Sequence, residues 1–305
     1  MKYAVTGAAG FIGSHLTERL LADGHDVVAV DSFTDYYDRT LKEDNARAFE
    51  VDRFDLAEQE LDLAGVDGVF HLAGQPGVRS FGDVFDEYAQ RNLLASRRVF
   101  EAAARAGVRV VFASSSSIYG DAERYPTPED TAPRPISPYG ITKLGCEHLA
   151  YAYAKGFGLD AVTLRYFTVY GPRQRPDMAF ARIVEALAGG TPFELYGDGY
   201  QSRAFTFVSD AVDATVAAME RAAPGCVYNV GGGSEATMRD AIAILERVAG
   251  RALELVERPA AEGDVRRTAP DTTRAERELG WRAETALEDG LERQWQWAAT
   301  KVAAR

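Results

Sequence analysis

The chain has 305 residues, of which 46% are hydrophobic and 26% charged, and its formal net charge is -12 at pH 7. This composition is typical of a globular protein with a sizeable core, and the negative charge argues against broad binding of nucleic acids or anionic membranes, which need a positive field. Cys146 and Cys226 lie far apart, so the sequence predicts neither a disulfide framework nor a metal site.

Apolar stretches are all too short to cross a bilayer, which takes about 20 uninterrupted apolar residues. The first residues, "MKYAVTGAAG", lack the basic region and long apolar run of a signal peptide. We therefore expect a cytoplasmic protein with no membrane partner.

The first half of the chain alternates short β-rich apolar runs with helical patterns. Strands are expected at 2–7, 26–31, 68–74 and 108–115, and helices at 11–24 and 87–107. A long helix follows at 137–158, opened by Ser-Pro, and then a buried strand at 159–167. Strands that are apolar on both faces and separated by helices indicate a parallel sheet covered on both sides. The sequence predicts an α/β fold of the Rossmann type, a doubly wound parallel sheet.

After Gly171 the alternation stops at a polar, proline-punctuated loop, "PRQRPDMAF". The segment 203–221 again has the pattern of a strand and helix of the central sheet. We expect residues 1–168 with 204–230 to form a dinucleotide-binding domain. Residues 169–203 with 231–305 are expected to form a smaller C-terminal α/β region that binds substrate.

Gly7, Gly10 and Gly13 follow the first strand and open the first helix in "VTGAAGFIGSHL". Glycines there let the backbone turn sharply and approach a pyrophosphate at the helix N-terminus. Asp31 ends the next strand, where a carboxylate accepts a hydrogen bond from a ribose 2′-hydroxyl and repels a 2′-phosphate. The pattern predicts NAD rather than NADP.

Tyr139 and Lys143 lie one turn apart in "SPYGITK", on one face of the long helix. An adjacent ammonium favours a phenolate over a phenol, so the two side chains together form a proton-transfer device. His71, which ends a strand beside the expected crevice, is assigned no proton-transfer role, because a buried histidine at such a position is commonly part of the core.

These motifs together resemble the extended short-chain dehydrogenases/reductases that act on nucleotide sugars. The resemblance covers nearly the whole chain, through "TGAAGFIGSH", "FHLAGQPGVRSF", "SSSSIYG", "SPYGITK", "LRYFTVYGPRQRPDMAF" and "GDGYQSRAFTFVSD". Within that family the chain is most similar to the UDP-glucuronic acid 4-epimerases. The resemblance implies an NAD-dependent isomerase that converts UDP-glucuronic acid to UDP-galacturonic acid through a 4-keto sugar, without decarboxylation.

By this resemblance Tyr139 is the general base, Lys143 holds the nicotinamide ribose and tunes Tyr139, and Ser115 binds the reacting 4-hydroxyl. The expected cofactor-binding residues are Gly7, Ala9, Gly10, Phe11, Ile12, Gly13, Asp31, Ser32, Asp55, Leu56, Leu72, Ala73, Gly74, Asn92, Ser114, Tyr139, Lys143 and Tyr166. The expected substrate-binding residues are Pro76, Ser115, Ser116, Ser117, Thr168, Arg175, Met178, Arg203, Asp264 and Arg266.

The serines of "SSSSIYG" stand where related dehydratases carry Asp and Glu, and where uronic acid decarboxylases carry Glu at the position of Ser117. Without a second acid or base, elimination has no proton donor. A 4-keto uronic acid loses carbon dioxide readily when its carboxylate aligns with the carbonyl. We therefore expect Ser116, Thr168 and Arg175 to hold that carboxylate out of alignment, with Arg173 as an alternative to Arg175.

Arg203 matches the family arginine that binds the substrate diphosphate, and Arg266 is a second candidate. The helix of Tyr139 and Lys143 has an apolar opposite face, including Leu144, Leu149 and Ala152, and the resemblance implies a homodimer through a four-helix bundle. Two other functions remain open, a 4-epimerase for neutral UDP-hexoses such as UDP-glucose, and an NAD-binding regulator that has lost turnover.

Overall fold

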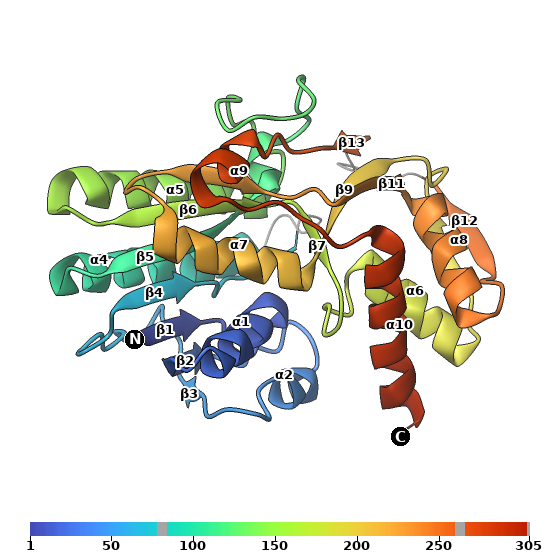
Figure 1. The fold of residues 1–305 in the computed structure, drawn as a ribbon, viewed down its shortest axis with the longest axis horizontal. Helices are drawn as coiled ribbons and strands as arrows, with labels where there is room; N and C mark the ends of the chain where they lie inside the picture. Colours follow the sequence, from blue (N-terminus) through green and yellow to red (C-terminus); the bar gives the residue numbers. More distant parts are fainter. Residues whose placement is uncertain (78–83, 260–265, 304–305) are drawn as a thin grey trace.

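A computed structural model describes residues 1–77, 84–259 and 266–303 (Figure 1). Its central feature is a seven-stranded sheet with strand order β10-β6-β5-β4-β1-β2-β3, in which all pairings are parallel. The strands are β1 Lys2–Thr6, β2 Asp26–Asp31, β3 Asp52–Arg53, β4 Gly68–His71, β5 Arg109–Ser115, β6 Ala161–Tyr166 and β10 Val227–Val230. The predicted doubly wound α/β fold is confirmed.

Both faces of this sheet are buried, because consecutive residues of one strand belong to different clusters. Val5, Phe70 and Val111 pack in a cluster with helices α1 and α7, whereas their neighbours Ala4 and Val69 pack in a cluster with α4 and α5. The helices around the sheet are α1 Phe11–Ala22, α2 Arg39–Asn45, α3 Phe85–Tyr88, α4 Ala95–Ala106, α5 Pro138–Phe157, α7 Val208–Arg221 and α9 Thr273–Leu279. The near-continuous apolar strands therefore reflect two covered faces.

Two features of the sheet region depart from the expectation. The helix expected at 87–107 is interrupted by a π-helical segment, η2 Ala89–Leu94, between α3 and α4. A 3-10 turn, η3 Ser116–Tyr119, directly follows β5. Both irregular segments adjoin the edge of the sheet where β4 and β5 end, and local helical tightening or bulging often marks functional positions.

A second region holds smaller sheets and the remaining helices (Figure 1). Its strands are β7 Thr168–Tyr170, β8 Phe193–Tyr196, β9 Ser202–Phe207, β11 Ser234–Thr237, β12 Leu255–Arg258 and β13 Arg267–Thr268, and its helices are α6 Ala179–Gly189, α8 Met238–Ala249 and α10 Leu287–Ala303. One expectation was wrong: β9 pairs with β7, β11 and β13 rather than with the central sheet, although α7 after it does pack there. A single strand's apolar pattern does not specify its neighbours.

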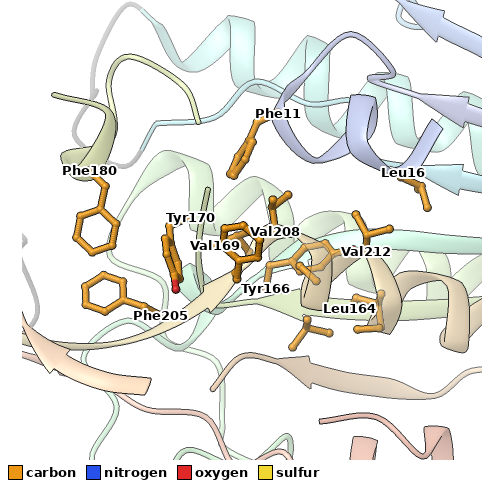
Figure 2. Close-up of a cluster of buried hydrophobic side chains, with 14 of the residues drawn as sticks. Phe11, Leu16, Leu164, Tyr166, Val169, Tyr170, Phe180, Phe205, Val208 and Val212 are labelled. Atoms are coloured by element: carbon orange, nitrogen blue, oxygen red, sulfur yellow. The ribbon is translucent and has the colours of Figure 1, made fainter. Parts of the chain in front are cut away.

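One continuous core joins the two regions (Figure 2). It runs from Phe11 and Leu16 on α1 through Tyr166 on β6 to Phe180 and Phe205 in the second region. Close-packed protein interiors have low compressibility, so elements that share one core keep their relative positions. The loop between β7 and α6 is therefore held in fixed relation to the glycine-rich turn after β1.

Within the described residues, no helix is long and apolar enough to cross a membrane. The cytoplasmic location stays a prediction.

Candidate active site

The carboxyl ends of the parallel strands β1, β2, β4, β5 and β6 meet at one edge of the sheet and line a cavity of about 260 Å³. Ligands of doubly wound proteins bind at this edge. Of the predicted site residues, the cavity brings together Gly7, Gly10, Phe11, Ile12, Gly13, Asp31, Ser32, Asp55, Leu56, Leu72, Ala73, Gly74, Pro76, Ser114, Ser115, Tyr139, Lys143, Tyr166, Arg175 and Met178.

The glycine-rich turn is shaped by close backbone approach. Gly7 has φ +73°, and a Cβ there would lie 2.8 Å from the backbone nitrogen of Ala73 on the neighbouring strand's loop. A Cβ on Gly13 would lie 2.1 Å from the carbonyl oxygen of Gly7. A larger residue at Gly7 would push away the loop after β4, and one at Gly13 would push α1 away from the turn. The N-terminus of α1 therefore stays open toward the cavity.

Asp31 ends β2 beside this turn and is 8% exposed. Its carboxylate accepts hydrogen bonds from the backbone N–H groups of Phe33 at 2.7 Å and Ala9 at 3.1 Å. Burial raises the pKa of Asp31, and these two hydrogen bonds oppose that shift. Ala9, predicted to bind cofactor, braces Asp31 through its N–H and is not among the residues that line the cavity.

These features fit NAD. The cavity reaches from Asp31 at the end of β2 to Tyr139 on α5, and it combines an open helix N-terminus with a buried carboxylate. The helix N-terminus suits a pyrophosphate and the carboxylate suits a ribose hydroxyl. The turn itself leaves no space for a Cβ on Gly13.

Tyr139 and Lys143 lie in the first turns of α5, whose start follows from its sequence. The hydroxyl of Ser137 accepts from the N–H of Gly140 at 3.1 Å, and Pro138 occupies the first helical position. Lys143 is 4% exposed, and its Nζ donates to the carbonyl of Ala113 on β5 at 2.8 Å. The Lys143 ammonium lies 5.9 Å from the centre of the Tyr139 ring.

The four serines have different roles. Ser115 accepts a hydrogen bond from the N–H of Ser117 at 3.1 Å, and its hydroxyl donates to that of Ser117 at 3.0 Å. Ser115 lines the cavity, whereas Ser116 and Ser117 lie in η3 and are not lining residues. Ser114 donates to Oε1 of Glu147 at 2.5 Å. Of the four serines, Ser114 and Ser115 line the cavity, and the hydroxyl of Ser114 is bound to Glu147.

Glu147 is a neighbour of the cavity-lining Ser114 that the sequence reasoning missed. It forms a buried, bidentate ion pair with Arg165 on β6, at 2.7 and 3.1 Å. It lies one turn after Lys143, so the spacing of Tyr139, Lys143 and Glu147 on one helix face was the available signal. The only acidic residues among the cavity's described lining are Asp31 and Asp55, which belong to the β2 and β3 end of the sheet.

Asn92 and His71 lie behind the cavity. Asn92, in the π-helical segment, accepts from the N–H of Gln75 at 2.7 Å and donates to the hydroxyl of Thr142 at 3.0 Å. It ties the loop after β4 to α5 and does not line the cavity. His71 is fully buried between the hydroxyls of Thr6 and Ser96, and burial lowers its pKa to about 3. His71 is therefore a neutral histidine of the core, as expected.

The loop between β7 and α6 separates the two candidate arginines. Arg173 has φ 65°, and its guanidinium binds Glu18 of α1 at 2.7 Å. Arg175 lines the cavity and binds both carboxylate oxygens of Asp177 at 3.0 Å. Burial disfavours the charge of Arg175, but Asp177 outweighs burial and the pKa of Arg175 is raised.

Tyr36 lines the cavity beside Arg175 and Asp177. Its hydroxyl donates to Asp177 at 3.4 Å, and burial together with the charge of Asp177 raises the pKa of Tyr36 to about 12. The sequence reasoning also missed the lining residues Val30, Thr34, Tyr36, Tyr37, Lys42, Phe54, Gln75, Arg91, Ala95, Ala113, Phe167 and Val169. The stretch from Thr34 to Lys42 lies between β2 and β3, outside the motifs, and carried no spacing signal.

The residues expected at the nucleotide end lie on the second sheet, away from the cavity lining. Arg203 is on β9, and Arg266 directly precedes β13, with its carbonyl accepting from the N–H of Ser202 at 3.0 Å. Thr168 begins β7 and does not line the cavity. Asp264 lies outside the described residues. Within the described residues, no cluster of His, Cys, Asp and Glu could hold a metal ion.

The fold and the site define a dinucleotide-binding α/β protein with a Ser, Tyr and Lys set at the cofactor crevice. The model of the NAD dependent epimerase/dehydratase family matches residues 3–231. The chain belongs to this family.

Relatives and solved structures of similar length agree with this assignment. The chain is 41% identical to the uncharacterized UDP-glucose epimerase YtcB of Bacillus subtilis (strain 168), over 95% of this chain and 96% of that protein. It is 34% identical to the UDP-glucuronate 4-epimerase of Thermodesulfobacterium geofontis (strain OPF15), over 98% and 97%. The structure of UDP-glucuronic acid 4-epimerase from Bacillus cereus, in complex with UDP-glucuronic acid and NAD, superimposes with a TM-score of 0.95 at 38% identity, covering 99% of this chain and 100% of that one.

Proposed function

We propose that this protein is an isomerase that interconverts UDP-glucuronic acid and UDP-galacturonic acid with NAD as its cofactor. One observation carries the choice of substrate: Arg175 lines the same cavity as Ser115 and Tyr139. A guanidinium there provides charge-assisted hydrogen bonds for a sugar carboxylate. The solved relative from Bacillus cereus, which binds UDP-glucuronic acid and NAD, supports the same substrate class.

The chain's own residues perform the proton chemistry. Tyr139 takes the proton of the 4-hydroxyl and later returns it, and Ser115 holds that oxygen by a hydrogen bond. Lys143, fixed to the carbonyl of Ala113, binds the nicotinamide ribose and keeps a positive charge beside Tyr139. Bound NAD supplies the acceptor and donor of the hydride at carbon 4. The residues that would hold it are those around Gly7, Gly13 and Asp31.

Decarboxylation of the 4-keto sugar is suppressed by what surrounds Ser115. The end of β5 carries hydroxyls, and Glu147 beside Ser114 is already paired with Arg165. Asp31 and Asp55 are separated from β5 by the intervening strands β4 and β1. With the carboxylate held by Arg175, no carboxylic acid among the described cavity lining lies beside β5 to assist its loss, and Ser116 and Thr168, which were expected to share this role, do not line the cavity.

The diphosphate anchors the substrate while the sugar turns. Arg203 on β9 and Arg266, which directly precedes β13, provide two guanidiniums for it. We keep the division proposed from the sequence, with residues 1–168 and 204–230 binding NAD and residues 169–203 and 231–305 binding the nucleotide sugar. The one change concerns strand β9, Ser202–Phe207, which crosses the boundary at 204 and pairs within the second sheet, so residues 204–207 go with the nucleotide-sugar region.

We also propose a homodimer built on α4 and α5. Leu144 and Leu149 pack partly against buried clusters, so they contribute less to an outer face than the sequence suggested. Exposed apolar side chains do occur on α5, with Ile141 47%, Tyr151 64% and Phe157 71% exposed. Apolar surface of this kind on one helix fits a second copy of the chain. Light scattering should give the mass of two chains, and Tyr151→Arg should shift it toward one.

The decisive experiment uses purified protein and UDP-glucuronic acid with no added NAD. We expect UDP-galacturonic acid to form, because NAD is regenerated in each cycle and stays bound. Carbon dioxide and a UDP-pentose as main products would refute the proposal.

A second function is 4-epimerisation of a neutral UDP-hexose. Asp177 neutralises Arg175 in this structure, so the cavity also tolerates an uncharged substituent at carbon 6. The similarity to a protein named a UDP-glucose epimerase also supports a neutral UDP-hexose as substrate. Turnover of UDP-glucose with none of UDP-glucuronic acid would establish this function in place of the first.

A further inference from the structure

The C-terminal helix reaches the arginine loop through two buried glutamines. Nε2 of Gln294 on α10 donates to Oε1 of Gln174 at 3.0 Å. Gln174 is 7% and Gln294 2% exposed. Since Gln174 stands between Arg173 and Arg175 in the sequence, this contact joins α10 to the middle of the loop.

Gln174 connects the loop to its surroundings on both sides. Its Nε2 donates to the carbonyl of Val169 on β7 at 3.2 Å, and its Oε1 also accepts from the N–H of Ala181 in α6 at 3.0 Å. Because Oε1 acts as an acceptor, Gln294 must present its NH₂ group to it. One side chain thus holds the strand before the loop, the helix after it and α10.

Helix α10 is in turn pressed against β7. The hydroxyl of Tyr170 donates to the carbonyls of Ala286 and Leu287, at 3.4 and 3.5 Å. A Cβ on Gly290 would lie 2.1 Å from that hydroxyl oxygen. The position of Gln294 is therefore set by close packing of α10.

The glutamine contact is a poor way to gain stability. Oε1 of Gln294 is buried and has no hydrogen-bond partner among the described residues. Leaving a buried acceptor unpaired has a cost that an apolar pair of the same volume would avoid. What the polar contact provides instead is one defined position for the loop.

We propose that Gln174 and Gln294 are positioning residues that fix Arg175 in the cavity and thereby set the preference for a uronate over a neutral sugar. This inference rests on the proposed function, in which Arg175 binds the sugar carboxylate. Bidentate and charge-assisted contacts depend steeply on position, so a loop that moves by about 1 Å loses much of the benefit.

The test measures binding of UDP-glucuronic acid, UDP-glucose and UDP to the NAD-loaded protein by calorimetry. Gln294→Leu removes the contact from the helix side and Gln174→Met from the loop side. Gln296→Leu is the matched control, because Gln296 is exposed on the same helix and binds Glu292. Thermal unfolding of each variant reports its folding separately.

Both single variants should weaken UDP-glucuronic acid binding about tenfold and raise its KM more than they lower kcat. UDP and UDP-glucose should change by less than about twofold, since neither has a carboxylate for Arg175. The double variant should lose no more than Gln174→Met alone, because Gln174→Met already removes the contact with Gln294 together with the bonds to Val169 and Ala181.

Equal weakening of all three ligands would overturn the inference, since it would indicate a general structural role. A wild-type preference for UDP-glucuronic acid that survives in both variants would overturn the inference alone. A wild-type protein that shows no preference for the uronate would contradict the proposed function itself and the inference with it.

Discussion

Replacing Arg175 by alanine should separate the two candidate substrates. The guanidinium lines the cavity of Ser115 and Tyr139, and its side chain is 24% exposed, so its hydrogen bonds compete only partly with water. A hydrogen bond to a charged group contributes about 1.5–3 kcal/mol. Loss of one such contact to the substrate carboxylate corresponds to about a 10- to 150-fold decrease in kcat/KM for UDP-glucuronic acid.

The remaining Asp177 increases this loss. Asp177 is held by Arg175 in two hydrogen bonds of 3.0 Å, and without them its negative charge has no cation beside it and keeps only the 3.4 Å hydrogen bond from Tyr36. This charge would repel the substrate carboxylate, more so where water is partly excluded. Arg175→Ala combined with Asp177→Asn should therefore recover part of the activity toward UDP-glucuronic acid.

The assay is the initial rate of epimer formation, measured in parallel for UDP-glucuronic acid and UDP-glucose by chromatography. UDP-glucose carries a neutral hydroxyl at carbon 6, so we expect its kcat/KM to fall by less than about fivefold. An equal loss for both substrates would refute the assignment of Arg175 to the carboxylate. Arg173→Ala is the control, because Arg173 binds Glu18 and lies outside the cavity lining.

Three further predictions concern the proton-transfer pair and the buried groups behind it. Tyr139→Phe should lower kcat by about 10²- to 10⁴-fold with unchanged binding of UDP and NAD, and turnover within tenfold of wild type would exclude Tyr139 as the base. In the unfolded chain His71 binds a proton below its ordinary pKa of about 6.5, whereas in the folded chain it stays neutral down to about pH 3. The free energy of unfolding should therefore decrease as the pH falls from 6.5, and His71→Gln should flatten that decrease in thermal melts at pH 7 to 5; parallel curves would contradict this. Glu147→Gln leaves the buried charge of Arg165 without its carboxylate, although Arg165 keeps its hydrogen bonds to Tyr119 and to the carbonyl of Glu129. The variant should reduce the free energy of unfolding by about 3–5 kcal/mol in urea, whereas a loss below about 1 kcal/mol would show that the pair is not structural.

The sequence predicted the parts of the site that depend on local geometry. Gly7 directly follows β1, Gly13 lies in the first turn of α1, and Asp31 is the last residue of β2. Parallel strands bring their carboxyl ends to one edge. Tyr139 and Lys143 needed only the spacing of one helix. Where the site residues lie at strand ends or one helix turn apart, the amino-acid sequence is sufficient to predict that they come together.

Long-range contacts limited the rest of the prediction. Nothing in "PRQRPDMAF" tells which arginine enters the cavity, because the answer depends on the φ of 65° at Arg173 and on Glu18 of α1. The contact of Gln294 with Gln174 likewise joins segments that no periodicity relates. The strand β9 was assigned to the wrong sheet for the same reason, since its apolar pattern suits either one.

The pairing of Arg175 with Asp177 bears on how the sugar turns over. A guanidinium has five N–H donors, and Asp177 occupies two of them at 3.0 Å. The substrate carboxylate can therefore use only the remaining donors, which weakens the hold on either epimer. A full bidentate contact would strongly favour one orientation of the sugar and slow release of the product. Binding that is equally strong in the ground state and the transition state does not raise kcat, so the extra affinity would bring no gain in rate. We infer that Asp177 limits the affinity of Arg175 to a level that keeps the carboxylate out of alignment and still lets the 4-keto sugar rotate about its anchored diphosphate.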